Sequence, residues 1–129
     1  MSAQLEEVAA WVERAVMDLR SARILRGHAG LETVACYLSQ QACEKALKAL
    51  LVAAGKSPPR VHDLVALGRE VRSAGFHVPC SDERLSEWSA YAVASRYPGF
   101  VDVQAERDLP DLLECAETLV ELVRALGKA

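Results

Sequence analysis

Residues 40–51 read Gln-Gln-Ala-Cys-Glu-Lys-Ala-Leu-Lys-Ala-Leu-Leu, and this stretch decides the fold. In the wider segment from Leu31 to Ala54, apolar residues recur three and four positions apart and cover a wide arc of a helix that is roughly 36 Å long. A helix that is apolar over so much of its circumference lies at the centre of a bundle. Gly55 is a natural stop for this helix, and Pro58-Pro59 forces an extended connection after it.

Helical spacing of apolar residues also predicts helices on both sides of this central one. The composition favours them, because Ala, Leu, Glu and Arg are strong helix formers and no alternation of period two is present. We therefore predict an all-α fold, an antiparallel up-and-down bundle of four long helices plus one short helix. Two of the predicted helices are Gln4–Arg26 and Val61–Ser73, and a third is capped by Ser81 and ends near Arg96. The last helix ends at Leu126 and has two possible starts. It starts either near Asp108, with Pro110 in its first turn, or at Asp102, with a kink at Pro110.

Length and charge narrow the class of protein. A chain of 129 residues suits one domain, which we expect over residues 1–129, with a core that needs no disulfide or metal. The formal net charge of −3 argues against a general nucleic-acid coat protein, although a small basic site remains compatible with it. No apolar stretch is long enough to span a bilayer and the first residues do not resemble a signal peptide. We expect a soluble, cytoplasmic protein without a membrane partner.

The four cysteines do not suggest a metal site or a redox site. They form no C-x-x-C pair, and no His stands at zinc-ligand spacing from them. Cys36, Cys43 and Cys115 fall in apolar helical patterns, where a reduced thiol behaves as a small buried hydrophobe. We expect no metal and no cofactor.

The polar side of the central helix is the first candidate site. Gln41, Glu44 and Lys48 stand three and four residues apart, together with Tyr37 and Lys45, so we predict that they form one ridge. One interpretation is an exposed Glu44–Lys48 pair that only stabilises the helix, and the pattern by itself favours it. The other is that these side chains face a groove, because a central helix has little free surface.

Two further segments carry candidate residues. His62 and Asp63 follow the Pro-Pro bend, where either could simply cap the next helix, or His62 could act as a base. Arg96 stands at the predicted end of a helix, where its charge suits the last carbonyl groups. Alternatively Arg96 holds a phosphate while Tyr91 or Tyr97 stacks on a base.

Together these segments resemble the HEPN domain (higher eukaryotes and prokaryotes nucleotide-binding). Order and spacing agree with that family from about Trp11 to Leu126, and the most specific part is the run over residues 40–51. The other matching pieces are Ala15-x-x-Asp18-Leu19-x-x-Ala22, His62-Asp63-Leu64-x-x-Leu67 and Ser95-Arg96-Tyr97-Pro98.

The resemblance implies an antiparallel helical bundle that is usually dimeric, and it suggests two functional classes. One branch of the family resembles the helical domain of antibiotic nucleotidyltransferases. Its members commonly accompany a separate minimal nucleotidyltransferase in a toxin–antitoxin or substrate-binding pair. The other branch comprises metal-independent ribonucleases, which use an Arg followed by a His after four to six intervening residues, assembled across a dimer.

The sequence departs from the ribonuclease pattern after Arg96, where Val101, Asp102 and Val103 occupy the positions open to the His. RNA cleavage needs a general base for the 2′-hydroxyl proton, so the usual chemistry is in doubt. Two stray Arg-x4-His matches, Arg23 to His28 and Arg72 to His77, lie near predicted turns and carry little weight.

Three functional hypotheses follow. The leading one is a nucleotide- or substrate-binding module, not itself an enzyme, that forms a homodimer and pairs with a minimal nucleotidyltransferase. The alternative is a metal-independent ribonuclease toxin with a degenerate motif, in which Arg96 and His62 are the catalytic candidates and His62 substitutes only if it lies near Arg96. The third is a structural dimer without a catalytic site. The expected ligand-binding residues, around a cleft for a nucleotide, RNA or the partner enzyme, are Gln41, Glu44, Lys48, His62, Tyr91, Arg96 and Tyr97.

Overall fold

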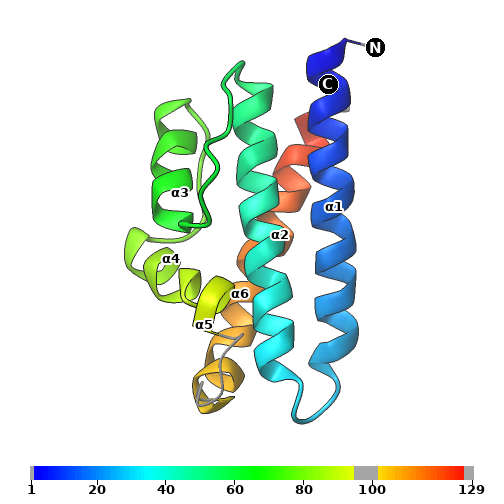
Figure 1. Ribbon diagram of the computed structural model, residues 1–129, viewed down its shortest axis with the longest axis vertical. Helices are drawn as coiled ribbons and strands as arrows, with labels where there is room; N and C mark the ends of the chain where they lie inside the picture. The colour runs from blue at the N-terminus through cyan, green and yellow to red at the C-terminus, as the bar shows by residue number, and fades with distance from the viewer. Residues whose placement is uncertain (1, 95–101, 127–129) are drawn as a thin grey trace.

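The computed structural model describes residues 2–94 and 102–126, with the side chains of all of these except 94, 102 and 103. It is built from α1 (Ala3–Arg26), α2 (Glu32–Ala53), α3 (Leu64–Ser73), α4 (Asp82–Ser89), α5 (Tyr91–Ala94) and α6 (Asp102–Leu126) (Figure 1). These two described ranges contain no strand. The predicted all-α bundle is therefore confirmed, with three long helices and three short ones in the described part of the chain.

Helix α2 lies in the middle of the molecule and contacts α1, α3, α5 and α6 (Figure 1). α1 runs antiparallel to α2, as an up-and-down order requires, and a short turn joins the two. α6 runs in the same direction as α2, because the chain first returns through the segment that holds α3, α4 and α5 (Figure 1). α6 and the segment that holds α3, α4 and α5 therefore cover α2 on two further sides.

The core explains the central place of α2. Leu47, Leu50 and Leu51 are at most 1% exposed, and full burial of each such side chain contributes about 1.5–3 kcal/mol. Between them stand small residues that let the neighbouring helices approach closely. These fully or almost fully buried small residues are Ala35, Cys36, Ala42, Cys43, Ala46 and Ala49.

Helix α3 begins three residues later than the sequence suggested, at Leu64 instead of Val61. The reason is that Asp63 is its N-cap: the Asp63 carboxylate accepts hydrogen bonds from the backbone N–H groups of Val65 (2.9 Å) and Ala66 (3.4 Å). A helix begins after its N-cap residue, so His62 lies in the connection between α2 and α3. Of the two capping residues considered, Asp63 is the one that caps.

The segment expected to form one helix from Ser81 to Arg96 is divided. Ser81 is the N-cap of α4 as predicted, accepting from the backbone N–H of Arg84 at 3.2 Å. At Ala90 the bonding changes to the tighter i to i−3 pattern, with Ala90 N–H donating to Glu87 (3.4 Å), and α5 follows as a separate turn of helix. Residues 95–101 lie outside the described residues.

The last helix follows the second of its two predicted starts. α6 begins at Asp102 and contains Pro110. Because proline has no backbone N–H, the Glu106 carbonyl lacks its usual helical partner at that point. None of the described helices has a stretch long and apolar enough to cross a membrane.

The cap of α3 can be tested by the substitution Asp63→Ala. Removing the side-chain acceptor leaves two backbone N–H groups without their cap, which costs about 1 kcal/mol of unfolding free energy. Urea denaturation measures the change. Glu70→Ala, at an exposed position of the same helix, is the control and should stay within about 0.5 kcal/mol of the parent protein. Equal midpoints for the two variants would show that the cap does not contribute.

Candidate functional site

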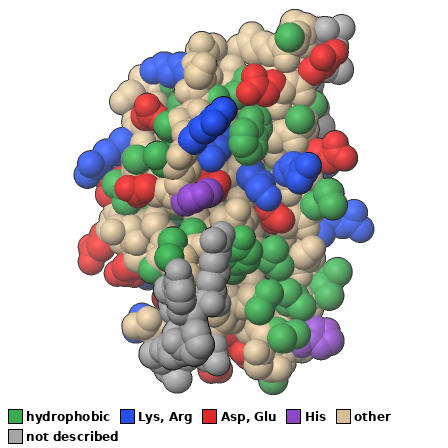
Figure 2. Space-filling view, in the orientation of Figure 1, with side chains coloured by type: hydrophobic (Ala, Val, Ile, Leu, Met, Phe, Trp, Pro, Cys, Tyr) green, Lys and Arg blue, Asp and Glu red, His purple; other side chains and the backbone are tan. Residues whose placement is uncertain are grey.

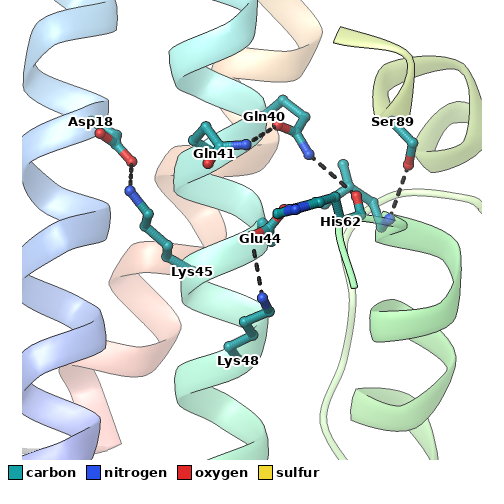
Figure 3. A network of polar contacts seen from close by, with 9 residues as sticks. Asp18, Gln40, Gln41, Glu44, Lys45, Lys48, His62 and Ser89 are labelled. Carbon is teal, nitrogen blue, oxygen red and sulfur yellow. Dashed lines mark hydrogen bonds and ion pairs between the residues drawn. The ribbon is translucent and has the colours of Figure 1, made fainter. Parts of the chain in front are cut away.

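Three polar side chains are buried on one side of α2. Gln40, Glu44 and Lys48 are 0%, 4% and 7% exposed, and their spacing of four residues aligns them along the helix. This side of α2 faces the connection that leads to α3 (Figure 3). Buried charges are costly unless they are paired and hydrogen-bonded, so their partners define the site.

Glu44 is the centre of this network. Its Oε1 lies 2.9 Å from His62 Nδ1, and its Oε2 accepts from Lys48 Nζ at 3.3 Å (Figure 3). A carboxylate accepts hydrogen bonds, so Nδ1 of His62 carries the proton and a neutral ring presents Nε2 as an acceptor. The His62 side chain is 65% exposed, whereas that of Glu44 is 5% exposed. The pair therefore links a buried carboxylate to a ring at the surface.

Gln40 and Gln41 complete the network around His62. Gln40 donates through Nε2 to the His62 backbone carbonyl at 3.4 Å, and its Oε1 accepts from Gln41 Nε2 at 2.6 Å. On the far side, the N–H of Leu64 donates to Ser89 Oγ at 2.9 Å (Figure 3). The backbone and the ring of His62 are thus both positioned by α2, while the start of α3 is held by α4.

Comparison with known proteins decides the family. A family model described as HEPN domain matches residues 8–126, which is nearly the whole chain.

The chain belongs to the HEPN family.

This confirms the resemblance found in the sequence. The crystal structure of the protein TT1696 from Thermus thermophilus is similar, with a TM-score of 0.67 over 92% of this chain and 96% of that chain. At 23% sequence identity the similarity establishes a shared fold. No curated protein matches the sequence significantly.

Four of the predicted site residues come together in this HEPN protein. Gln41, Glu44, Lys48 and His62 all belong to the network on α2. The predicted ridge is nevertheless divided, because Lys45 points to α1, where its Nζ lies 2.5 Å from Asp18 Oδ2 (Figure 3). Glu44 and Lys48 are also buried, so the interpretation of an exposed pair does not apply to them.

Tyr91 lies apart from this network. It is 2% exposed, and its hydroxyl donates to Asp108 Oδ2 at 2.9 Å. Burial raises the pKa of the Tyr91 hydroxyl above its usual value, and burial raises the pKa of the neighbouring Cys36 thiol from 9.0 to about 12. A ring so enclosed has no face for a base, so the candidate site does not include Tyr91. Arg96 and Tyr97 lie outside the described residues.

The structure adds three residues that the sequence reasoning did not select as site residues. Gln40 belongs to the run over residues 40–51, but its role toward the His62 carbonyl depends on a residue 22 positions away. Trp11 lies under Lys48, whose Nζ is 5.5 Å from the centroid of the Trp ring. Arg60 shares a pocket with both Trp11 and Lys48. Gln40 stands one helical turn before Glu44, a spacing that could have indicated it, whereas Trp11 joins the site only through the fold. Among the described residues, no group of three or more His, Cys, Asp or Glu side chains is arranged to hold a metal ion.

The substitution Glu44→Ala tests the centre of the network. It leaves the Lys48 ammonium group, on a side chain only 9% exposed, without its carboxylate, and breaking such a buried pair costs about 3 kcal/mol. Chemical denaturation of the two proteins gives the difference in unfolding free energy. Glu117→Ala is the matched control, because the Arg23–Glu117 pair lies at the surface and should contribute less than about 1 kcal/mol. A loss for Glu44→Ala no larger than that of the control would contradict the network.

Proposed function

We propose that this HEPN protein is a nucleotide-binding module that forms a homodimer and works with a separate nucleotidyltransferase. HEPN membership supports a nucleotide-binding or ribonuclease-type module, and the pairing with an enzyme is our finer inference. The observation that carries the proposal is the Glu44 network, which leads from the buried side of α2 to an exposed His62 ring. A nucleotide offers the acceptors and donors that such a set of side chains recognises.

A binding role accounts better than a purely structural role for the buried polar side chains of α2. Replacing a buried ion pair by apolar side chains of similar size is often neutral or stabilising, so the pair itself is weak support for stability. The network also ends at a ring that is 65% exposed, where it can meet a ligand.

Calorimetric titration with ATP, GTP and a short RNA tests the binding role. We expect saturable binding of at least one of them, and about tenfold weaker binding by His62→Ala, because that change removes the exposed end of the network. His28→Ala, at an exposed position in the turn between α1 and α2, is the matched control and should bind as the parent protein does. If none of the three ligands binds, the proposal fails.

One observation favours the ribonuclease alternative as a second candidate. A general base is efficient when another group orients it, and Glu44 holds His62 in that way at 2.9 Å. In this alternative, Nε2 of His62 takes the proton from a ribose 2′-hydroxyl whose oxygen attacks the adjacent phosphorus. The bond from phosphorus to the 5′-oxygen of the next nucleotide then breaks, which leaves a 2′,3′-cyclic phosphate, and the departing oxygen takes a proton from water. Arg96, the other catalytic candidate, lies outside the described residues.

An RNA cleavage assay in the presence of a metal chelator separates the two candidates. The binding role predicts no cleavage above the rate in buffer. Cleavage that disappears in both His62→Ala and Arg96→Ala, but persists in His28→Ala, would transfer the assignment to the ribonuclease. Circular dichroism of each variant shows whether it is folded.

A further inference from the structure

A pocket lies beside the Glu44 network, between α1, α2 and the connection that follows α2. Its volume is about 460 Å³, within the range of roughly 300–1,000 Å³ that is usual for small-molecule sites. Lys48 contributes to this pocket and to the network, so the two are continuous. The residues that characterise the pocket are Glu7, Trp11, Lys48, Pro58, Pro59 and Arg60.

Two cations line this one pocket. Lys48 Nζ makes one contact of 3.3 Å with Glu44 and lies over the Trp11 ring, which leaves donor capacity on an ammonium group that has three N–H bonds. Arg60 is exposed and forms no ion pair with any residue in the described ranges. Guanidinium and ammonium groups bind phosphate through charge-assisted hydrogen bonds. Figure 2 shows Lys and Arg side chains over the upper half of the face in view, with Asp and Glu side chains among them.

The pocket also offers an aromatic surface. Trp11 is partly buried, and it stands beside Pro58 and Pro59 in the lining of the pocket. Indole rings stack on nucleobases independently of sequence. Glu7 stands one helical turn before Trp11 and lines the same pocket, where its carboxylate can accept from a ribose hydroxyl or a base amino group. A ligand that is only a phosphate would use neither this acid nor the stacking surface of this ring.

We propose that the pocket binds a nucleoside phosphate, with the phosphate between Lys48 and Arg60 and the base against Trp11. This inference rests on the proposed nucleotide-binding function and names its ligand-binding residues. It places the phosphate next to Lys48, so that the ligand reaches the edge of the Glu44–His62 network. The site uses Trp11 and Arg60, which lie far from the position of Arg96 in the sequence.

The two tryptophans of the chain allow a direct test. Trp88 belongs to α4 and lines a different pocket, so the part of a fluorescence change that Trp11→Phe abolishes reports on Trp11. We expect ATP to change this fluorescence, and Trp11→Phe to lose the change. Arg60→Ala should bind ATP about tenfold more weakly in calorimetry, whereas Arg69→Ala, an exposed arginine on α3, should bind as the parent protein does. Adenosine, which lacks the phosphate groups, and pyrophosphate, which lacks the nucleoside, should both bind at least about tenfold more weakly than ATP.

The outcomes separate this inference from the function on which it rests. If ATP binds in calorimetry but Trp11→Phe and Arg60→Ala bind it as tightly as the parent protein, the pocket is wrong and the nucleotide-binding role stands. If neither ATP nor GTP nor RNA binds the parent protein, both are wrong. Pyrophosphate that binds as tightly as ATP would overturn the role of Trp11. Thermal unfolding of each variant confirms that the substituted proteins are folded.

Discussion

The structure depends on how a carboxylate is compensated inside an apolar helix bundle. Glu44 is almost completely buried on α2, and a buried charge is tolerated only with partners close by. One partner, Lys48, comes from the next turn of the same helix, and the other, His62, comes from the connection 18 residues away. The contact between Glu44 and His62 therefore holds the connection after α2 against this helix. The same contact brings α1 into the site, because the Lys48 ammonium group rests on Trp11.

The Glu44 network and the pocket are connected, because Lys48 belongs to both. Through one oxygen the Glu44 carboxylate orients the imidazole of His62 at the surface, and through the other it holds the Lys48 ammonium group, which lines the pocket. A binding module would use both sides to recognise a ligand. A nuclease would need the imidazole to take part in proton transfer as well. HEPN membership supports a nucleotide-binding or ribonuclease-type module, and our proposal of a binding role draws on the departure of residues 101–103 from the ribonuclease pattern.

Helix periodicity predicted the bounds of the helices whose apolar residues repeat regularly along the sequence. The bounds of α1 and α2 agree with the predicted ones to within a residue, because their apolar positions repeat regularly and a glycine follows each helix. The grouping of Glu44, Lys48 and His62 was also predictable, partly from spacing and partly from the family resemblance. The spacing of residues along the sequence could not predict the direction in which each side chain points. Lys45 and Lys48 are three residues apart and both contact α1, but Lys45 pairs with Asp18, whereas Lys48 pairs with Glu44 and lies over Trp11. The same holds for Tyr91, which lies apart from the network and donates to Asp108, a partner that nothing local in the sequence indicates.

The parallel course of α2 and α6 has a consequence for the way the chain folds. α1 and α2 are joined by a turn of a few residues, so closing that hairpin costs little chain entropy. α6 can reach α2 only after the whole segment from residue 54 to residue 101 has been accommodated. Contacts between residues far apart in sequence form more slowly than local ones. The α1–α2 hairpin, which already holds Trp11, Glu44 and Lys48, is thus the part of the molecule best able to form early. The pocket is lined by residues between Glu7 and Arg60, so a nascent chain contains all of them before its last helix exists.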